Sequence, residues 1–107
     1  MLSKKNRADK KTVEDIFKQG KFINSTFLTF KFIKKELKTT KISFIVPKTV
    51  SKLAVKRNLL RRLGYKALKD TFESVPKGII GVFLFKKYQD NTQILKDEIK
   101  EILNKIN

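Results

Sequence analysis

The sequence predicts an α+β two-layer sandwich, in which helices pack on a small mixed sheet. Three observations support this fold class: segments where apolar residues alternate, segments where they recur at helical spacing, and an element order of α-β-β-α-β-α. The length of 107 residues suits one domain, and no repeat or linker divides the chain. We therefore expect a single domain over residues 1–107.

A basic arm and a short helix come first. Residues 1–11 are polar and basic, and we expect them to be mobile. Val13, Ile16 and Phe17 then share one helical face. Gly20 is a natural helix stop, so the pattern predicts a helix of about two turns before it.

Two alternating segments follow and predict two strands. Residues 22–35 are rich in Phe, Thr and Ile, and residues 41–46 alternate in the same way. Pro47 ends the second strand because Pro cannot donate to a ladder. We expect these strands to pair as an antiparallel hairpin. Their Phe residues could stack on bases, but one strand face must pack on the helices, so we expect most of them in the core; they are Phe27, Phe30, Phe32 and Phe44.

The second half of the chain predicts a helix, a strand and a helix. Residues 51–72 carry Leu and Ala on one helical face, with Gly64 as a weak point inside. Residues 79–86 are continuously apolar, which is typical of a central strand. Asn91 or Thr92 can cap the last helix, whose apolar stripe runs to the end of the chain.

The positive charge is concentrated in the long helix. The chain has 26 Lys and Arg against 10 Asp and Glu, a net charge of 26 − 10 = +16, which favours a polyanionic partner. Three of its four Arg fall between Arg57 and Arg62, and Arg grips phosphate with a planar fork. An ordinary solvated face is the alternative, which this clustering of Arg disfavours. The predicted nucleic-acid surface consists of Lys52, Lys56, Arg57, Asn58, Arg61, Arg62, Tyr65, Lys66 and Lys69.

Composition excludes several kinds of chemistry. The chain has no Cys and no His, so disulfides, Cys/His zinc sites, thiol nucleophiles and a His general base are absent. None of the ten acids falls within a predicted strand, where a two-metal nuclease would gather them. We therefore expect neither catalytic residues nor a metal site in the polypeptide. The absence of a signal peptide and of a membrane-spanning run predicts a cytoplasmic protein without a membrane partner.

Residues 46–62, VPKTVSKLAVKRNLLRR, resemble the signature of the bacterial ribonuclease P protein component. That family has a V-x-K run ending a strand, then A-(V/H)-x-R-N-R-x-K-R-x-x-R in the next helix. Residues 13–20 resemble its first helix and residues 27–30 its first long strand, so the likeness covers about residues 6–106. The chain departs from the pattern at Leu59 and Tyr65, which replace Arg, and at Val13, which replaces a common Phe.

The resemblance implies the protein subunit of a ribonucleoprotein that removes the 5′ leader from precursor tRNA. In this family an RNA subunit, with Mg²⁺, performs the hydrolysis, so the implied partners are ribonuclease P RNA and precursor tRNA. The protein binds the RNA through the basic helix, and it contacts the leader in a cleft between the first helix and the sheet. Carried over by position, the RNA contacts are Arg57, Asn58, Arg61 and Arg62, and the cleft wall is Val13, Phe17 and Phe30.

The resemblance also implies a left-handed β-α-β crossover around the long helix. General rules of topology would predict a right-handed one.

Two other functions remain open at this point. A ribosomal or other structural RNA-binding protein would share the charge and size, and it would bind RNA without stimulating cleavage. A protein of anionic membrane surfaces needs a helix with one apolar and one basic face. The last helix has the apolar stripe but is nearly neutral, and the basic helix contributes to the core, so the membrane function is disfavoured.

Overall fold

The computed structural model describes residues 14, 16–18, 20–34, 40–72, 75 and 77–106. Residues 14 and 16–18 are helical, and the ordered elements after them are β1 (Lys21–Asn24), β2 (Leu28–Lys34), β3 (Lys41–Ile45), α2 (Ala54–Lys69), β4 (Ile79–Phe85) and α3 (Thr92–Ile106). The arm predicted at residues 1–11 and the predicted cleft residue Val13 lie outside the described residues.

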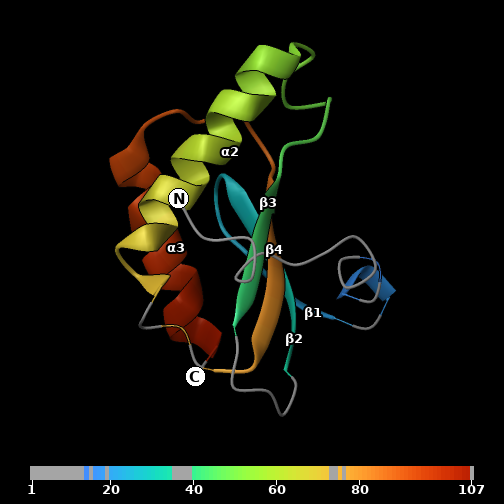
Figure 1. Ribbon diagram of the computed structural model, residues 1–107, viewed down its shortest axis with the longest axis vertical. Helices are drawn as coiled ribbons and strands as arrows, with labels where there is room; N and C mark the ends of the chain where they lie inside the picture. The colour runs from blue at the N-terminus through green and yellow to red at the C-terminus, as the bar shows by residue number, and fades with distance from the viewer. Residues whose placement is uncertain are drawn as a thin grey trace.

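The four strands form one mixed sheet in the order β1-β2-β4-β3. β1 pairs antiparallel with β2, β2 antiparallel with β4, and β3 parallel with β4. Helices α2 and α3 cover one face of the sheet, and the helical residues 16–18 lie against the other (Figure 1). This arrangement confirms the predicted α+β fold with helices on a small mixed sheet.

Two expectations about the strands are wrong. The segment 22–35 forms two strands instead of one, because the chain turns between Asn24 and Leu28. Within this turn the backbone N–H of Ser25 donates to the carbonyl of Leu28 at 2.8 Å, and the Glu98 carboxylate accepts the N–H of Phe27 at 2.9 Å. The expected hairpin between β2 and β3 is absent, since β4 lies between them and pairs with both.

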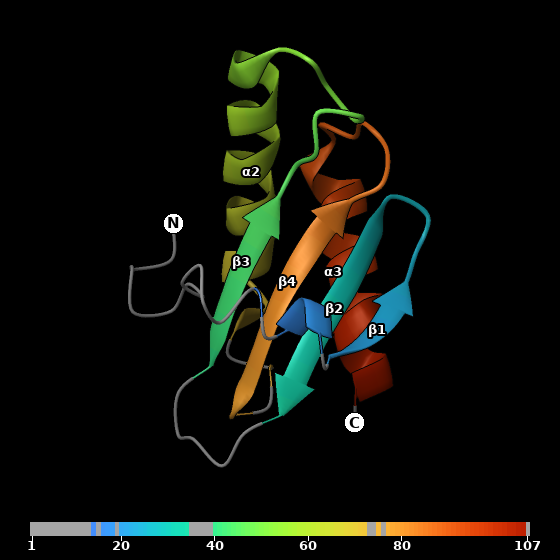
Figure 2. The same cartoon turned by 90° about the vertical axis from the view of Figure 1, so that its right-hand side faces the viewer.

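The connection from β3 through α2 to β4 is left-handed. Seen with the sheet in front, β3 and β4 both point upward, β4 lies to the right of β3, and α2 passes behind them (Figure 2). A right-handed connection would place β4 on the other side of β3. The crossover therefore has the hand that the family resemblance implies.

Helix α2 is shorter than the predicted span of 51–72. It begins at Ala54, and Leu53 at its N-cap makes no side-chain capping bond. Leu60, Ala67 and Leu68 are buried as the helical stripe predicts, whereas Leu53 is 65% exposed.

The central strand and the last helix follow the prediction closely. β4 is buried along nearly its whole length between β2 and β3. The Asn91 side chain caps α3, because its Oδ1 accepts the N–H groups of Gln93 at 2.9 Å and Ile94 at 3.2 Å. The apolar stripe of α3 faces the core, with Ile94 partly outside it.

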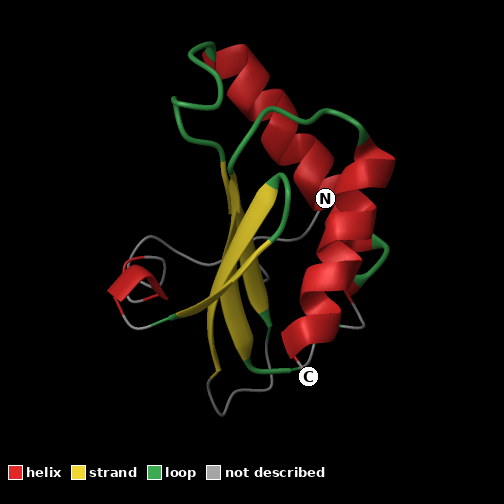
Figure 3. Ribbon diagram, turned by 180° about the vertical axis from the view of Figure 1, so that it is seen from behind, coloured by secondary structure: helices red, strands yellow, loops and turns green. Residues whose placement is uncertain are grey.

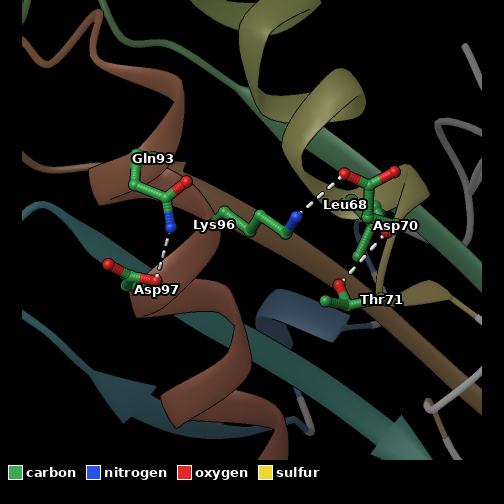
Figure 4. A network of polar contacts seen from close by, with 6 residues as sticks. All are labelled: Leu68, Asp70, Thr71, Gln93, Lys96 and Asp97. Carbon is green, nitrogen blue, oxygen red and sulfur yellow. Dashed lines mark hydrogen bonds and ion pairs between the residues drawn. The ribbon is translucent and has the colours of Figure 1, made fainter.

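Helices α2 and α3 lie side by side on the same face of the sheet (Figure 3). At the end of α2, the ammonium of Lys96 from α3 reaches the carboxylate of Asp70 at 3.0 Å (Figure 4). The hydrogen bond from Lys96, together with its charge, holds the pKa of Asp70 below its ordinary value. The Thr71 hydroxyl donates to the Leu68 carbonyl at 3.2 Å and closes the same helix end.

Candidate nucleic-acid interface

The exposed face of α2 is strongly cationic. No Asp or Glu occurs between Glu36 and Asp70 in the sequence. Among the described residues, the ion pairs are Lys96–Asp70 and Lys105–Glu101, and neither uses a cation of α2. The helix and the residue before its N-cap therefore present an uncompensated positive surface, which we call the basic face; its exposed members are Lys52, Lys56, Asn58, Arg61, Arg62, Lys66 and Lys69.

Two Arg side chains of the predicted set make hydrogen bonds within the protein. The half-buried Arg57 donates from Nη1 to the carbonyls of Ser51 at 3.0 Å and Lys52 at 2.8 Å. This guanidinium braces the loop that carries Lys52. Arg61 Nη2 donates to Asn58 Oδ1, so an exposed amide and an exposed guanidinium are held together on the basic face.

The prediction that Tyr65 belongs to the basic face is wrong. Tyr65 is 7% exposed, its hydroxyl accepts the N–H of Phe44 at 3.2 Å, and its ring meets that of Phe44 edge-on at 4.9 Å. The residue lies at the border of the helical stripe, where a long aromatic side chain can reach the sheet. In this position it cannot stack on a nucleotide.

A second surface lies on the sheet face opposite α2 and α3. Ile16 packs there on Ile80 and Val82, and the N–H of Gly20 closes this helical segment by donating to the Ile16 carbonyl at 2.7 Å. Gly20 is therefore the helix end that the sequence predicts. We call the buried cluster of Ile16, Ile80 and Val82 the apolar floor. Half-buried side chains pack against it, and they are Ile33, Ile45 and Leu84.

Aromatic and cationic groups meet at the edge of this floor. Phe17 is 43% exposed, and the Lys31 ammonium lies 4.9 Å from the centre of its ring. Phe22, 63% exposed, pairs with Lys31 across β1 and β2, so both side chains project from the same side of the sheet. We call Phe17, Phe22 and Lys31 the outer aromatic cluster.

The expectation that Phe30 lines this surface is wrong. Phe30 is fully buried beneath the helices, where it stacks on Phe83 at 4.3 Å and on Phe32 at 5.3 Å. Successive strand residues point to opposite faces, and Thr29 and Lys31 are the neighbours that face outward. Phe22 and Lys31 are not among the predicted site residues, although the polar residues alternating with apolar ones in β2 mark that face. The core position expected for most strand Phe residues is confirmed at Phe30, Phe32 and Phe44.

The acids in the described part of the chain do not gather into a metal site. No group of three or more carboxylates that could hold an ion occurs among these residues. The buried acid, Glu98, accepts a backbone N–H as described above. None of the described helices is long and apolar enough to cross a bilayer.

Solved structures resemble the fold of this chain, and a family model matches its sequence. The ribonuclease P protein of Thermotoga maritima superposes with a TM-score of 0.78 at 20% identity, covering 88% of this chain and 90% of that one. The ribonuclease P protein of Staphylococcus aureus superposes with a TM-score of 0.79 at 14% identity, covering 98% and 97%. No curated protein sequence matches the chain. The family model described as Ribonuclease P matches residues 2–107. The chain therefore belongs to the ribonuclease P protein family.

Proposed function

We propose that this chain is the protein subunit of ribonuclease P and assists endonucleolytic removal of the 5′ leader from precursor tRNA. The observation that supports this most is the presence of two RNA-suited surfaces on different layers of one domain. The basic face lies on the helix layer, and the outer aromatic cluster lies on the opposite face of the sheet.

The basic face suits the structured RNA subunit. Lys and Arg side chains neutralise phosphates and position a protein on a folded RNA without reading its sequence. Arg61 and Arg62 can each grip a phosphate with two donors, and the Arg57 brace fixes the loop that adds Lys52.

The outer aromatic cluster suits the unpaired leader. Single strands bind where aromatic faces stack on bases and nearby cations follow the backbone. Phe17 and Phe22 supply two exposed rings, and Lys31 supplies a charge between them. The leader-binding wall that we propose therefore keeps Phe17 from the predicted set and replaces Phe30 with Phe22 and Lys31.

We assign the hydrolysis of precursor tRNA to the RNA subunit. The described acids form no cluster suited to Mg²⁺, so we place the ion on the RNA and the assembled complex. There Mg²⁺ would supply the activation of water for hydrolysis. The residues of this chain bind and orient the two RNAs. We place the protein in the cytoplasm, with the precursor tRNA.

Leader release from labelled precursor tRNA at low Mg²⁺ tests the proposal. The reaction is run with a bacterial ribonuclease P RNA alone, with the protein alone and with both. Cleavage that requires both, or is strongly stimulated by the protein, is the expected result. Tight binding to the cognate ribonuclease P RNA without any stimulation would favour a ribosomal or other structural RNA-binding role.

Arg61→Ala, compared with Lys105→Ala, separates the basic face from overall charge. Both variants remove one positive charge, but Lys105 lies on α3 beside Glu101. Arg61→Ala should weaken RNA binding and keep the free energy of unfolding within about 1 kcal/mol, because its side chain is exposed. Equal losses of affinity in the two variants would contradict a localised interface.

A further inference from the structure

Two aliphatic side chains are strongly exposed where α2 begins. Val55 is 75% exposed and Leu53 is 65% exposed, more than any other large apolar side chain in the described part of the protein. Single exposed apolar residues are common on protein surfaces. Two of them within three residues, at the end of the most basic helix, call for an explanation. We call Leu53 and Val55 the aliphatic tip.

The stability of the fold does not explain why Leu53 and Val55 are aliphatic. The first turns of α2 and the loop before it extend beyond the ends of the strands (Figure 1). Leu53 occupies the N-cap in an extended conformation, where Ser, Thr, Asp or Asn would accept a helix N–H and stabilise the helix. The sequence thus has an exposed Leu at a position where a polar residue would favour folding. The Arg57 brace on Ser51 and Lys52 also fixes the loop that presents Leu53.

The positive charge near the aliphatic tip favours an anionic partner. Lys48, Lys52 and Lys56 are exposed around it, and the first turn of α2 holds no acid. A membrane surface fits poorly, because the large buried aliphatic side chains of α2, Leu60 and Leu68, face the core and two strongly exposed aliphatic groups are too few to anchor a helix in lipid. A nucleotide offers both kinds of contact at once, a phosphate for Lys and an apolar ribose or base face for Leu and Val.

We propose that the aliphatic tip is an apolar RNA contact, in which Leu53 and Val55 pack on an exposed ribose or base of the RNA subunit while the neighbouring Lys residues hold its phosphates. The inference rests on the proposed RNA-binding function and adds a contact to it. This contact differs in kind from the others on the basic face, because apolar packing releases no counterions and its contribution should not depend on salt.

A salt titration separates the two kinds of contact. Binding of the full chain to ribonuclease P RNA is measured from about 100 to 400 mM KCl, where the slope of log K against log salt reports the number of neutralised phosphates. Leu53→Ser with Val55→Ser should weaken binding about tenfold at every salt concentration and leave the slope unchanged, since tenfold corresponds to about 55 Å² of lost apolar contact. Lys56→Ala should instead reduce the slope by about one.

Stability and a matched variant control for indirect effects. Leu53→Ser places a good N-cap residue at the start of α2, so its urea midpoint should stay the same or rise while its RNA affinity falls. Unfolding therefore cannot explain the loss in this single variant. Ile94→Ser removes an aliphatic group that is 37% exposed on α3 and should leave RNA affinity unchanged.

Three results would overturn the inference. Unchanged affinity in the double variant would exclude the apolar contact, and a reduced slope would show that the substitution disturbed phosphate contacts instead. A dimer of the free protein that the double variant abolishes in sedimentation would assign the aliphatic tip to a second copy. Failure of the proposed function is a separate result, because the unsubstituted protein itself would then not bind ribonuclease P RNA.

Discussion

Tyr65 joins the helix layer to the sheet through one hydroxyl. Its oxygen accepts the N–H of Phe44 from β3, and both residues are buried. Helical spacing places Tyr65 on the side of Arg61, so the sequence predicts an exposed ring. The Tyr side chain is long enough for its hydroxyl to reach the sheet. Helical spacing predicts the direction of a side chain but not how far the side chain extends.

Replacing Tyr65 with Phe tests this contact. The substitution keeps the ring and leaves the buried N–H of Phe44 without the hydroxyl oxygen, so the free energy of unfolding should fall by about 1–2 kcal/mol. Urea denaturation measures the change, and RNA affinity should stay the same. Tyr88→Phe is the control, since that hydroxyl is exposed and lies 3.5 Å from Asp90. Equal stability of the two variants would contradict the role given to Tyr65.

At the scale of elements, the close approach of α2 to β3 depends on Gly64. A Cβ at this position would lie 2.6 Å from Cδ1 and 2.7 Å from Cε1 of Phe44. From the sequence, Gly64 is only a weak point in a helix. The residue that packs against it, Phe44, lies in β3, so helical spacing cannot show this contact. The missing side chain is what allows the ring of Phe44 to lie against the helix.

Gly64→Ala should therefore destabilise the protein. In an open helix this change stabilises by up to about 1 kcal/mol, but the crowding with Phe44 should reverse the sign and lower the free energy of unfolding by about 1–3 kcal/mol. Thermal or urea unfolding measures it, and Lys66→Ala on the exposed side of α2 serves as the control. A stabilised Gly64→Ala variant would show that the ring moves aside without cost.

The junction of α2 and α3 predicts a pH dependence. The pKa of Asp70 is lowered by the hydrogen bond from Lys96 and by its charge, so the folded state binds a proton at this group less readily than the unfolded state. The resulting stability is fully present above the ordinary pKa near 3.8, and it is lost as the pH falls through the lowered pKa of the folded state. The exposed position keeps the effect small.

Asp70→Asn measures this contribution. The difference in unfolding free energy between the natural protein and the variant should be constant near neutral pH and should shrink as the pH falls below about 4. Urea denaturation at a series of pH values gives the curve. A difference that grows on acidification would mean that the carboxylate is not stabilised by Lys96.

Much of the element order could be predicted from local patterns, and the pairing of the strands could not. The apolar run of β4 and the Asn91 cap are visible in neighbouring residues, and both are confirmed. The turn between β1 and β2 has no Gly or Pro, and Phe27 continues the apolar character through it. The Glu98 carboxylate that holds this turn lies 71 positions away in the chain, beyond any local pattern.

At the scale of the whole molecule, positive charge is concentrated on α2, whereas α3 carries both acids and bases. The net charge is +16, the basic face holds many of the cations, and α3 carries acids that pair with Lys or cap the sheet turn. Composition alone predicts a polyanionic partner, and the motif predicts that this partner binds α2. Alternation along β2 marks its outward-facing residues, but the position of Phe22 opposite Lys31 could not be predicted, because the turn at residues 25–27 that sets this pairing has no Gly or Pro.

RNA affinity should therefore depend steeply on salt. If about five cations of the basic face neutralise phosphates, raising KCl about fourfold should weaken binding to ribonuclease P RNA by roughly 10²–10³-fold. Filter binding or fluorescence anisotropy measures the slope. An affinity that is the same at low and moderate salt would rule out phosphate neutralisation as the main source of binding.

The central place of β4 has a consequence for the order of events during synthesis. β2 and β3 each pair with β4, which follows them in the chain, so both keep an open edge until residue 85 has left the ribosome. The β1–β2 hairpin is the pairing among the described strands that neighbouring residues can complete early. Because α3, which runs to Ile106, also closes the core, the sheet should assemble only after β4 and α3 have both been synthesised.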